Sequence, residues 1–462
     1  MGSNPKEVLC MAADEQAGTG LQVFQLAKER LCEKIVSKSA VVGVVGLGYV
    51  GLPFAVEKAK VGFRVIGIEE NPARAEKVNR GENYISDVSD EELRALVESG
   101  KLSAEIDFER VPEMDVIVIC VPTPLTRNLT PDLQYVEKVT KQIVLRMRRG
   151  QLVSLESTTY PGTTEEVILP ILQASSGLKV EEDFFLVYSP ERVDPGNKRY
   201  TTRNTSKVVG GVGPNSLEVG VTFYRQTVKE VVPVSSARAA ELVKVFENTF
   251  RAVNIALVNE LAMLCDRMEL NVWEVLEAAF TKPFGIMPFY PGPGVGGHCI
   301  PVDPHYLEWK AKELNFNTHF IALAGEINRR MPEFVKQKAL RILNRLGVAA
   351  SRASIFILGV AYKKDIADAR ESPAIELIRL LKREGAHVCY HDHLIPVIRD
   401  ADLEMASTPL TAEALRQSDL VIIATDHSYV DYNWVVQEAR HVLDTRNATR
   451  HVTNNRERIT LL

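Results

Sequence analysis

The sequence has few cysteines, no long apolar stretch and no excess of positive charge. Its six cysteines, among 462 residues, form neither a CxxC pair nor a Cys/His zinc spacing. This argues against a disulfide framework or a structural metal, and for reduced thiols in the cytoplasm. No apolar run approaches the ~20 residues that cross a bilayer, and residues 1–16 lack the basic-then-apolar order of a signal peptide. The net charge of -5 offers no basic surface for nucleic acid. The remaining expectation is an ordinary globular protein with length for about three domains.

Short apolar runs alternate with amphipathic stretches in two parts of the chain, which predicts parallel sheets covered by helices. In the first part, strands are expected at 40–46, 64–69, 115–121, 152–156 and 184–188, and helices at 91–99 and 134–148. In the second part, strands are expected at 354–359, 387–391 and 419–425, and helices at 373–384 and 411–416. Between them, helices alone are expected, at 237–268, 271–279 and 328–346. Residues 21–36 predict one more amphipathic helix near the amino terminus.

The predicted fold class is α/β, with two Rossmann-like doubly wound domains joined by a central long-helix domain. The expected domains are an N-terminal extension (1–39), a dinucleotide-binding Rossmann domain (40–235), a central helical domain suited to an interface (236–350) and a second Rossmann-like domain (351–462). A weak internal repeat supports the two copies. The strand and glycine at Gly46 recur at Gly359, and the strand and acid at Glu69 recur at Asp392. The second copy lacks GxGxxG, so we expect it to bind something other than a dinucleotide.

The segment from Gly46 to Gly51 reads Gly-Leu-Gly-Tyr-Val-Gly and is a dinucleotide-binding fingerprint. It follows an apolar strand and precedes a predicted helix, as the motif requires. An acidic residue, Glu69, ends the next strand, where it can bind a ribose. A carboxylate there repels a 2′-phosphate, which favours NAD over NADP. Arg74 is the nearby residue that could weaken this preference.

Cys299 lies in a glycine-rich segment, Gly-Gly-His-Cys-Ile-Pro-Val-Asp-Pro at 296–304, four residues before a carboxylate. Ordinary alcohol oxidation needs a hydride acceptor and a base but no nucleophile. A thiol beside a nicotinamide therefore suggests an aldehyde held as a thiohemiacetal and oxidised again to a thioester. The alternative is a buried structural cysteine.

Other polar residues have both a functional and a structural interpretation. Lys244 and Asn248 project from one face of a long helix, although a lysine there is commonly a solvated charge. Glu191 follows a strand end, where α/β sheets place ligand groups, although it could equally be a surface carboxylate. The segment at 157–162 could bind a ligand or cap a helix. The nine histidines form no cluster that favours a metal site, so no metal is expected.

Several motifs together carry a family resemblance. In chain order they are Gly-Leu-Gly-Tyr-Val-Gly-Leu-Pro (46–53), Val-Pro-Thr-Pro (121–124), Glu-Ser-Thr-Thr-Tyr-Pro-Gly-Thr-Thr (156–164), Pro-Gly-Pro-Gly-Val-Gly-Gly-His-Cys-Ile-Pro-Val-Asp-Pro (291–304), Tyr-Lys-Lys-Asp (362–365) and Arg-Glu-Ser-Pro (370–373). Residues 40–450 thereby resemble the UDP-glucose/GDP-mannose dehydrogenase family of nucleotide-sugar 6-dehydrogenases. The resemblance implies a four-electron oxidation, in which a nucleotide sugar, two NAD⁺ and water give the uronate and two NADH. It also implies UDP-sugar binding by 351–462 and a homodimer formed through the central helices.

The resemblance assigns roles to individual residues. Cys299 resembles the nucleophile, while Lys244 and Asp303 resemble the pair that stabilises an alkoxide and handles the proton or water. Asn248 matches an oxyanion-side amide, and Glu191 and Thr158 match residues that bind or activate the hydrolytic water. The implied cofactor-binding residues are Gly46, Gly48, Tyr49, Val50, Gly51, Glu69, Val121, Pro122, Thr123, Ser157 and Thr158. The implied substrate-binding residues are Glu191, Arg192, Lys244, Asn248, Arg251, Tyr290, Gly294, Gly296, Tyr362, Lys363 and Arg370.

One segment departs from the pattern of the UDP-glucose enzymes, which tend to read Pro-Glu-Phe-Leu-x-Glu-Gly. Here 190–197 reads Pro-Glu-Arg-Val-Asp-Pro-Gly-Asn, so Pro195 replaces the second glutamate and Asp194 lies beside it. Together with His298, this resembles the subgroup that acts on UDP-N-acetylhexosamines, particularly UDP-N-acetylglucosamine. UDP-glucose, TDP-glucose and UDP-N-acetylmannosamine stay open as substrates. A two-electron β-hydroxyacid dehydrogenase is a more distant alternative, against which Cys299 and the second Rossmann-like domain argue. A non-catalytic nucleotide-sugar-binding protein is another, against which the joint presence of Cys299, Lys244, Asn248 and Asp303 argues.

Overall fold

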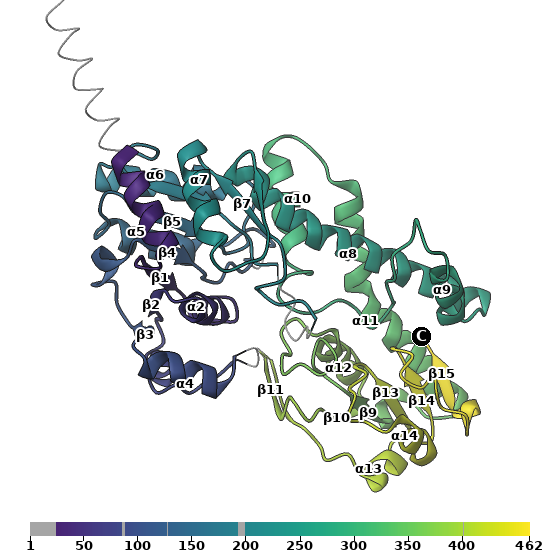
Figure 1. Cartoon of the computed structure of the whole chain (residues 1–462). Coiled ribbons are helices and arrows are strands. Elements are labelled where there is room, and N and C mark those ends of the chain that lie inside the picture. Colours follow the sequence, from purple (N-terminus) through teal and green to yellow (C-terminus); the bar gives the residue numbers. More distant parts are fainter. Residues whose placement is uncertain (1–24, 86–87, 127, 193–198, 401) are drawn as a thin grey trace, which may run out of the picture. The chain divides into compact units, whose positions relative to one another are not determined.

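The computed structural model describes residues 25–462 apart from 86–87, 127, 193–198 and 401 (Figure 1). The chain forms two compact units, Met1–Phe246 and Glu247–Leu462, and the division falls within the long helix α8 (Ala237–Met268). Residues 25–36 are helical, which confirms the described part of the helix predicted at 21–36. This helix packs on the domain that follows, because Leu31 and Ile35 join its core and Lys34 forms an ion pair with Asp115.

The first unit is built on one eight-stranded sheet. Its strand order is β3-β2-β1-β4-β5-β6-β7-β8, in which the first six pair in parallel and β7 runs antiparallel to β6. The strands are β1 (Val41–Val45), β2 (Arg64–Ile68), β3 (Leu102–Glu105), β4 (Val116–Ile119), β5 (Leu152–Leu155), β6 (Phe185–Tyr188), β7 (Lys207–Gly211) and β8 (Val231–Val234). The five strands expected from apolar runs are all present, each trimmed by one to three residues.

Helices cover both faces of this sheet, which explains why its central strands β1 and β4 are apolar throughout. Alternate residues of β4 point to opposite cores: Val116 and Val118 join one, Ile117 and Ile119 the other. The first core is closed by α2 (Gly51–Lys60) and α7 (Pro214–Tyr224), and the second by α5 (Gln134–Val144) and α6 (Leu169–Ser176). Beyond them lie α3 (Pro72–Asn79), α4 (Asp90–Glu98), the 3₁₀ turn at Val111–Glu113 and the π-turn at Thr164–Ile168.

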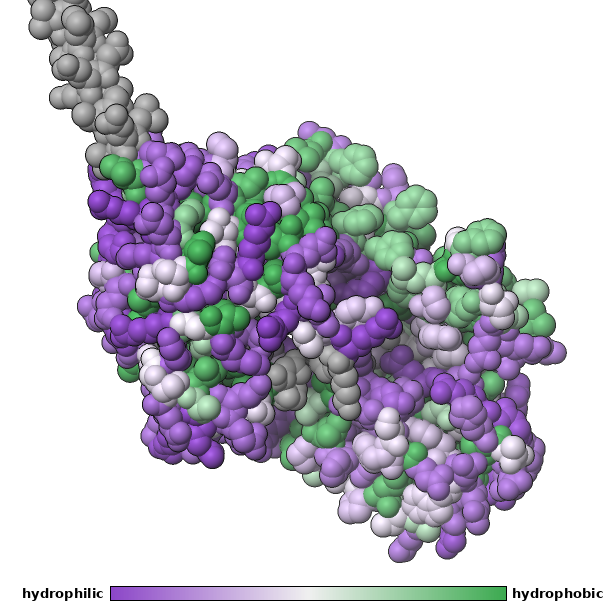
Figure 2. Space-filling model, viewed as in Figure 1, coloured by the Kyte–Doolittle hydropathy of each residue, from purple (hydrophilic) through white to green (hydrophobic). Residues whose placement is uncertain are grey.

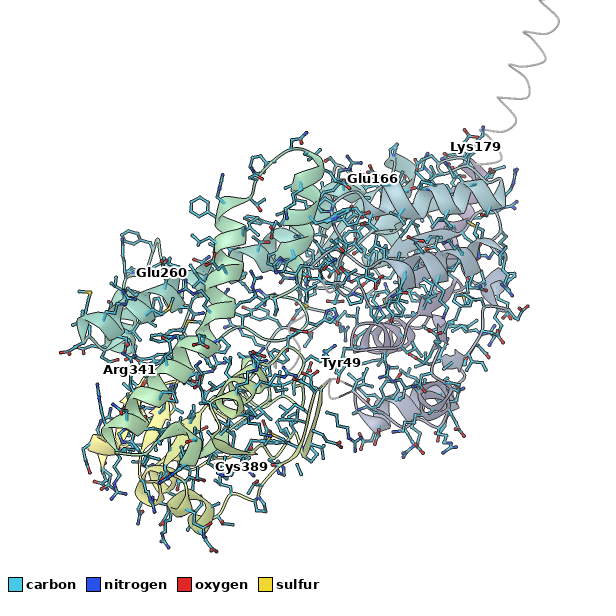
Figure 3. All side chains as sticks on the ribbon, turned by 180° about the vertical axis from the view of Figure 1, so that it is seen from behind. Tyr49, Glu166, Lys179, Glu260, Arg341 and Cys389 are labelled. Carbon is cyan, nitrogen blue, oxygen red and sulfur yellow. The ribbon has the colours of Figure 1, made fainter. Side chains whose placement is uncertain are left out.

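The second unit begins with helices. The bounds predicted for α8 match the structure, and it is followed by α9 (Val272–Phe280), α10 (Asp303–Glu313) and α11 (His319–Arg345). Helix α10 was not predicted, and α11 begins well before the expected residue 328 and contains Pro332. The salt bridges from Asp266 of α8 to Lys338 and Arg341 of α11 hold these two helices side by side (Figure 3 labels Arg341).

A five-stranded parallel sheet completes the second unit, with strand order β10-β9-β13-β14-β15. The strands are β9 (Ser354–Leu358), β10 (His387–His391), β13 (Leu420–Ile423), β14 (Val442–Asp444) and β15 (Ile459–Leu461), with a separate hairpin of β11 (Val397–Asp400) and β12 (Leu403–Ala406). The helices are α12 (Pro373–Arg383), α13 (Ala412–Gln417) and α14 (Tyr432–Glu438), and 3₁₀ turns lie at Ala350–Arg352 and Arg456–Arg458. The predicted fold class, with two Rossmann-like domains and long helices between them in the chain, is confirmed.

None of the helices in the described ranges combines the length and hydropathy needed to span a bilayer.

Candidate active site

The loop from β1 to α2 has the geometry of a dinucleotide cradle. Gly46 adopts a φ of +88°, a backbone conformation that L-residues rarely adopt. A Cβ on Gly51 would lie 1.8 Å from the carbonyl oxygen of Gly46, so only glycine permits this close turn. Among the described residues, no side chain caps the start of α2, so no capping side chain competes with an anion at this helix N-terminus. Tyr49 is 49% exposed at this loop (Figure 3), and Val50 precedes the helix.

Glu69 is buried directly behind this loop. One carboxylate oxygen accepts a hydrogen bond from the amide of Leu47 at 3.1 Å and the other from the amide of Asn71 at 3.0 Å. The carboxylate is thus fixed at the end of β2 and still has lone pairs for ribose hydroxyls. Arg74 lies over the ring of Tyr84, 5.6 Å from its centroid. These residues fit NAD, and a carboxylate in this place disfavours the 2′-phosphate of NADP.

The ends of β4 and β5 meet beside each other, as parallel neighbours do. The hydroxyl of Ser157 donates to the carbonyl of Val121 at 2.7 Å, and that of Thr123 donates to the carbonyl of Thr158 at 2.6 Å. The structure therefore brings together the residues predicted to bind the cofactor after these two strands, Pro122 included. The neighbouring Thr159 is fully buried.

Glu191 lies three residues beyond Tyr188, the last residue of β6. One carboxylate oxygen accepts from the amide of Arg192 at 2.7 Å, and the other lies 3.3 Å from the ammonium of Lys207. The guanidinium of Arg192 donates to the carbonyl of Ser206. Lys207 was not predicted, because the first residue of a short strand reads as an ordinary surface lysine. The predicted sugar preference rests on four residues here together with His298, and these four, Asp194, Pro195, Gly196 and Asn197, lie outside the described residues.

Lys244 and Asn248 lie one turn apart on α8 and are 7% and 0% exposed. The interpretation of Lys244 as a solvated charge is therefore wrong. In the second unit, the side-chain amide of Asn248 donates to the carboxylate of Asp303, and its oxygen accepts from Arg251. Arg251, Asn248 and Asp303, each predicted as a site residue, thus form one hydrogen-bonded chain.

Cys299 and Asp303 are held in one turn at the start of α10. The carbonyl of Cys299 accepts from the amide of Val302 at 3.1 Å and from that of Asp303 at 2.9 Å. Asp303 is 2% exposed and is the first residue of α10, whereas Cys299 is only partly buried. None of the cysteines in the described part of the chain forms a disulfide. The turn therefore fixes an accessible thiol close in the chain to a buried carboxylate.

The glycines before Cys299 pack against the segment that follows β9. Gly297 has a φ of +88°, and its amide donates to the carbonyl of Arg370 at 3.0 Å. A Cβ on Gly297 would lie 2.8 Å from the ring of Tyr362, and one on Gly296 would lie 2.7 Å from the carbonyl of Glu371. The thiol loop is therefore joined directly to the segment predicted to bind the nucleotide.

Arg370 is oriented by a neighbour that the sequence did not reveal. Its guanidinium binds Asp368 through Nε at 3.0 Å and Nη2 at 2.6 Å, and its side chain is 48% exposed. Burial lowers the pKa of His298, and the positive charge of Arg370 adds to this effect, so His298 is neutral near pH 7. Gly294 packs on Pro373 in the same segment, which also carries Lys363. Tyr290 instead lies against Trp273 and Phe280, which belong to α9.

The second Rossmann-like domain repeats the strand-and-glycine geometry of the first, but its acidic residue, Asp392, is occupied by hydrogen bonds from its own domain. The amide of Gly46 donates to the carbonyl of Ile68 at 2.8 Å, and that of Gly359 to the carbonyl of His391 at 2.9 Å. Asp392 corresponds to Glu69 and accepts from the amides of Val360 and Ala361 through one oxygen.

That same oxygen of Asp392 lies 3.0 Å from Nε2 of His427. Nδ1 of His427 accepts from the amide of Asp365, so Nε2 carries the proton and donates. Burial raises the pKa of Asp392, but hydrogen bonds from His427 and the two amides outweigh burial and lower it to about 2. The carboxylate is saturated by hydrogen bonds within its own domain, which agrees with the missing GxGxxG motif in this part of the sequence.

Comparison with known proteins decides the family. The models of the UDP-glucose/GDP-mannose dehydrogenase family match over their NAD binding domain at 40–228, their central domain at 238–330 and their UDP binding domain at 356–451. The chain belongs to this family. It is an NAD-dependent nucleotide-sugar dehydrogenase, and both the cofactor and the predicted reaction class are confirmed.

Its relatives act on different sugars. The chain is 36% identical over 412 residues to the UDP-N-acetyl-D-mannosamine dehydrogenase of Pyrococcus horikoshii, covering 88% of this chain and 95% of the relative. It is also 36% identical over 392 residues to the UDP-N-acetyl-D-glucosamine 6-dehydrogenase of Pseudomonas aeruginosa, covering 85% and 91%. The solved structure of a UDP-D-ManNAc dehydrogenase from P. horikoshii superposes with a TM-score of 0.81 at 33% identity, covering 88% of this chain and 96% of that one.

Proposed function

We propose that this dehydrogenase oxidises the C6 hydroxyl of a UDP-N-acetylhexosamine, UDP-N-acetylglucosamine, to the uronate in two steps that pass through a thioester on Cys299. The observation that carries this proposal is the turn from Cys299 to Asp303, joined to Asn248 by the bond between Asn248 and Asp303. A two-electron dehydrogenase has no use for such a thiol. A protein that only binds nucleotide sugars has no use for a buried carboxylate beside it.

In this proposal each residue has a distinct chemical role. NAD, when bound, accepts the hydride in each of the two oxidations. Lys244 stabilises the alkoxide at C6 and later the oxyanion, with the side-chain amide of Asn248 as a second donor. The thiolate of Cys299 adds to the C6 aldehyde and holds it as a thiohemiacetal, so that no aldehyde escapes. Asp303 takes up the proton that leaves the C6 hydroxyl.

Hydrolysis of the thioester completes the reaction. Water attacks the carbonyl carbon, a C–O bond forms, and the C–S bond breaks to return the thiolate of Cys299. We assign Glu191 to take the proton of this water and Thr158 to orient it. The bond from Arg192 to Glu191 and the bond from Thr123 to the carbonyl of Thr158 support these assignments, because they fix both segments at strand ends.

For the nucleotide, we propose that Tyr362, Lys363 and Arg370 hold the diphosphate and its surroundings. The guanidinium of Arg370 is half exposed and is held by Asp368, which leaves part of its donor fork for phosphate oxygens. The close packing of Gly297 on Tyr362 supports a direct link between nucleotide binding and the position of the thiol.

An N-acetyl group on the sugar is the expected specificity determinant. The named relatives act on UDP-N-acetyl sugars, and the neutral His298 beside Cys299 can hydrogen-bond an amide. A site that pairs with this amide leaves polar groups unpaired when glucose binds. UDP-N-acetylglucosamine should therefore exceed UDP-glucose in kcat/KM by at least about tenfold, or on the order of 1.4 kcal/mol.

A panel of UDP-N-acetylglucosamine, UDP-N-acetylmannosamine, UDP-glucose and TDP-glucose, each followed by NADH absorbance, measures this preference. If UDP-glucose or TDP-glucose is the best substrate, the N-acetylhexosamine assignment is wrong, whereas the reaction class is unaffected. If UDP-N-acetylmannosamine is best, only the choice of epimer fails.

We also propose a homodimer formed through the second unit. Phe250, Leu257 and Leu264 recur every seven residues along α8 and are 40%, 62% and 51% exposed, so they form an apolar stripe on one face. Figure 2 shows hydrophobic residues gathered over α8, α9 and the connection from α10 to α11. Apolar patches of this kind on a globular protein are typical of protein interfaces.

The stripe can be tested by light scattering of the full chain at micromolar concentration. The wild type should have the mass of two chains, and Leu257→Asp should shift it to one chain. Leu145→Asp is the matched control, because Leu145 is 70% exposed at the end of α5 and lies far from the stripe in the chain. A dimer that survives Leu257→Asp would place the interface elsewhere.

We propose that the protein acts in a reducing compartment, the cytoplasm. Cys299 must be reduced to act, and a disulfide would remove its reactive sulfur.

A further inference from the structure

A fully buried lysine lies between two carboxylates in the first unit. The ammonium of Lys207, at the start of β7, is 2.8 Å from an oxygen of Glu156 and 3.3 Å from an oxygen of Glu191. The side chains of Lys207 and Glu156 are 4% and 0% exposed, whereas Glu191 is 16% exposed. Lys207 therefore connects the interior of the sheet to the carboxylate at the end of β6.

The interior half of this cluster is closed by further hydrogen bonds. The hydroxyl of Tyr224, on α7, donates to the second oxygen of Glu156 at 2.7 Å and also lies 2.7 Å from the hydroxyl of Ser154. Glu156 is thus held from both sides. Its partner Lys207 has little freedom to move, so the lysine presents a fixed positive charge to Glu191.

The charge on Lys207 persists in spite of its burial. Burial by itself lowers the pKa of a lysine, but the charges of Glu156 and Glu191 and the hydrogen bond that Lys207 donates to Glu156 outweigh burial and raise the pKa of Lys207. Burial raises the pKa of Glu156, against the opposing effects of Lys207 and Tyr224. A lysine that served only to neutralise Glu156 would need one carboxylate, yet this lysine also reaches a second, partly buried one, Glu191.

We propose that Lys207 is a positioning residue for Glu191, fixing its carboxylate and favouring the ionised form that takes the proton from the hydrolytic water. This inference rests on the proposed function, which assigns that step to Glu191. The amide of Arg192 holds one oxygen of Glu191 and Lys207 holds the other, so both ends of the carboxylate are defined. In the step itself, water adds to the thioester carbonyl, its proton passes to Glu191, and Cys299 leaves as the thiolate. No electrons are exchanged with a cofactor.

The inference predicts how hydrolysis depends on pH. A base must be deprotonated to act, so the rate of thioester hydrolysis falls as the pH drops through the pKa of Glu191. We call this fall in rate at low pH the acid limb of the pH–rate profile. An opposite charge within about 4 to 6 Å commonly lowers a carboxyl pKa by 1 to 3 units. Removing Lys207 should therefore move the acid limb to higher pH by about one unit or more.

The experiment follows the covalent adduct on Cys299 by rapid quench and intact-protein mass spectrometry of the full enzyme, with NAD and UDP-N-acetylglucosamine, across pH. In the double variant Lys207→Met/Glu156→Gln, which removes the buried pair together, the acid limb should move upward. Lys207→Arg keeps the charge and should leave the limb within about 0.3 units. Glu156→Gln leaves the whole charge of Lys207 to Glu191, so its limb should move in the opposite direction, downward.

Structural damage alone would lower the rates of all these variants without moving the limb, and that result would overturn the inference. Glu156→Gln tests it independently if the double variant does not fold, because an unmoved or raised limb there also contradicts it. Glu191→Gln separates this inference from the proposed function. It should accumulate the adduct and show no acid limb. If no variant forms an adduct on Cys299, the proposed function is wrong. If adducts form and the acid limbs of the variants coincide with that of the wild type, only the role proposed for Lys207 is wrong.

Discussion

Replacing Cys299 with alanine should lower steady-state NADH production by on the order of a thousandfold or more, because no thioester can form without the thiol. The affinity for NAD and for the nucleotide sugar should change little. The cradle at Gly46 to Gly51 belongs to another part of the chain. The backbone carbonyl of Arg370 accepts a hydrogen bond from the amide of Gly297, so this contact with the thiol loop does not depend on the side chain of Cys299. Initial rates and equilibrium binding of both ligands measure the two effects separately.

Cys389→Ala is the matched control for this change. Cys389 is a partly buried thiol on β10, and its Sγ lies 3.8 Å from the carbonyl of Ile355. It should keep activity within about twofold. Cys299→Ser should form an ester that hydrolyses slowly, since an alkoxide is a poorer leaving group than a thiolate. Near-normal turnover in Cys299→Ala would return this cysteine to a structural role.

Replacing Lys244 with methionine should lower kcat by about 10² to 10³-fold, the usual loss when one donor to a developing oxyanion is removed. Methionine matches the length of the aliphatic stem, so the packing of this 7% exposed side chain is largely kept. The KM for the sugar nucleotide should change much less than kcat, because the ammonium acts on charge that develops during the reaction.

Arg267→Met provides the comparison, since Arg267 is an exposed cation in the last turn of the same helix. Steady-state kinetics of both variants should show a large loss of kcat only for Lys244→Met. An equal and small effect in the two variants would mean that Lys244 is merely a buried structural lysine, and the oxyanion would then rely on Asn248.

The fold could be predicted well from the sequence where burial is uniform. Parallel strands covered on both faces are apolar throughout, so β1 and β4 stood out as runs, and α8 was found to the residue because it has regular apolar spacing without Pro or Gly. The antiparallel strand β7 was missed because it begins with a charged residue and ends in two glycines. Helix α10 was missed because Pro304 and its mixed composition hide its periodicity.

The residues of the candidate site that belong to local sequence motifs could be predicted. Those that depend on an ion pair formed by folding could not. The glycines of the cradle, Cys299 and Asp303 lie in recognisable local patterns. The bonds between Lys207 and Glu156, or between Arg370 and Asp368, join charges whose burial the sequence does not show. Charged residues are usually exposed, so a buried ion pair reads as two surface residues until the fold brings the partners together.

The number of NADH molecules formed per sugar consumed tests the central claim most directly. With limiting UDP-N-acetylglucosamine and excess NAD, the thioester account predicts a ratio of two and no free aldehyde detectable by a carbonyl-trapping reagent throughout the reaction. A ratio of one, with an aldehyde released as the product, would contradict the role of Cys299 and make this protein a simple alcohol dehydrogenase.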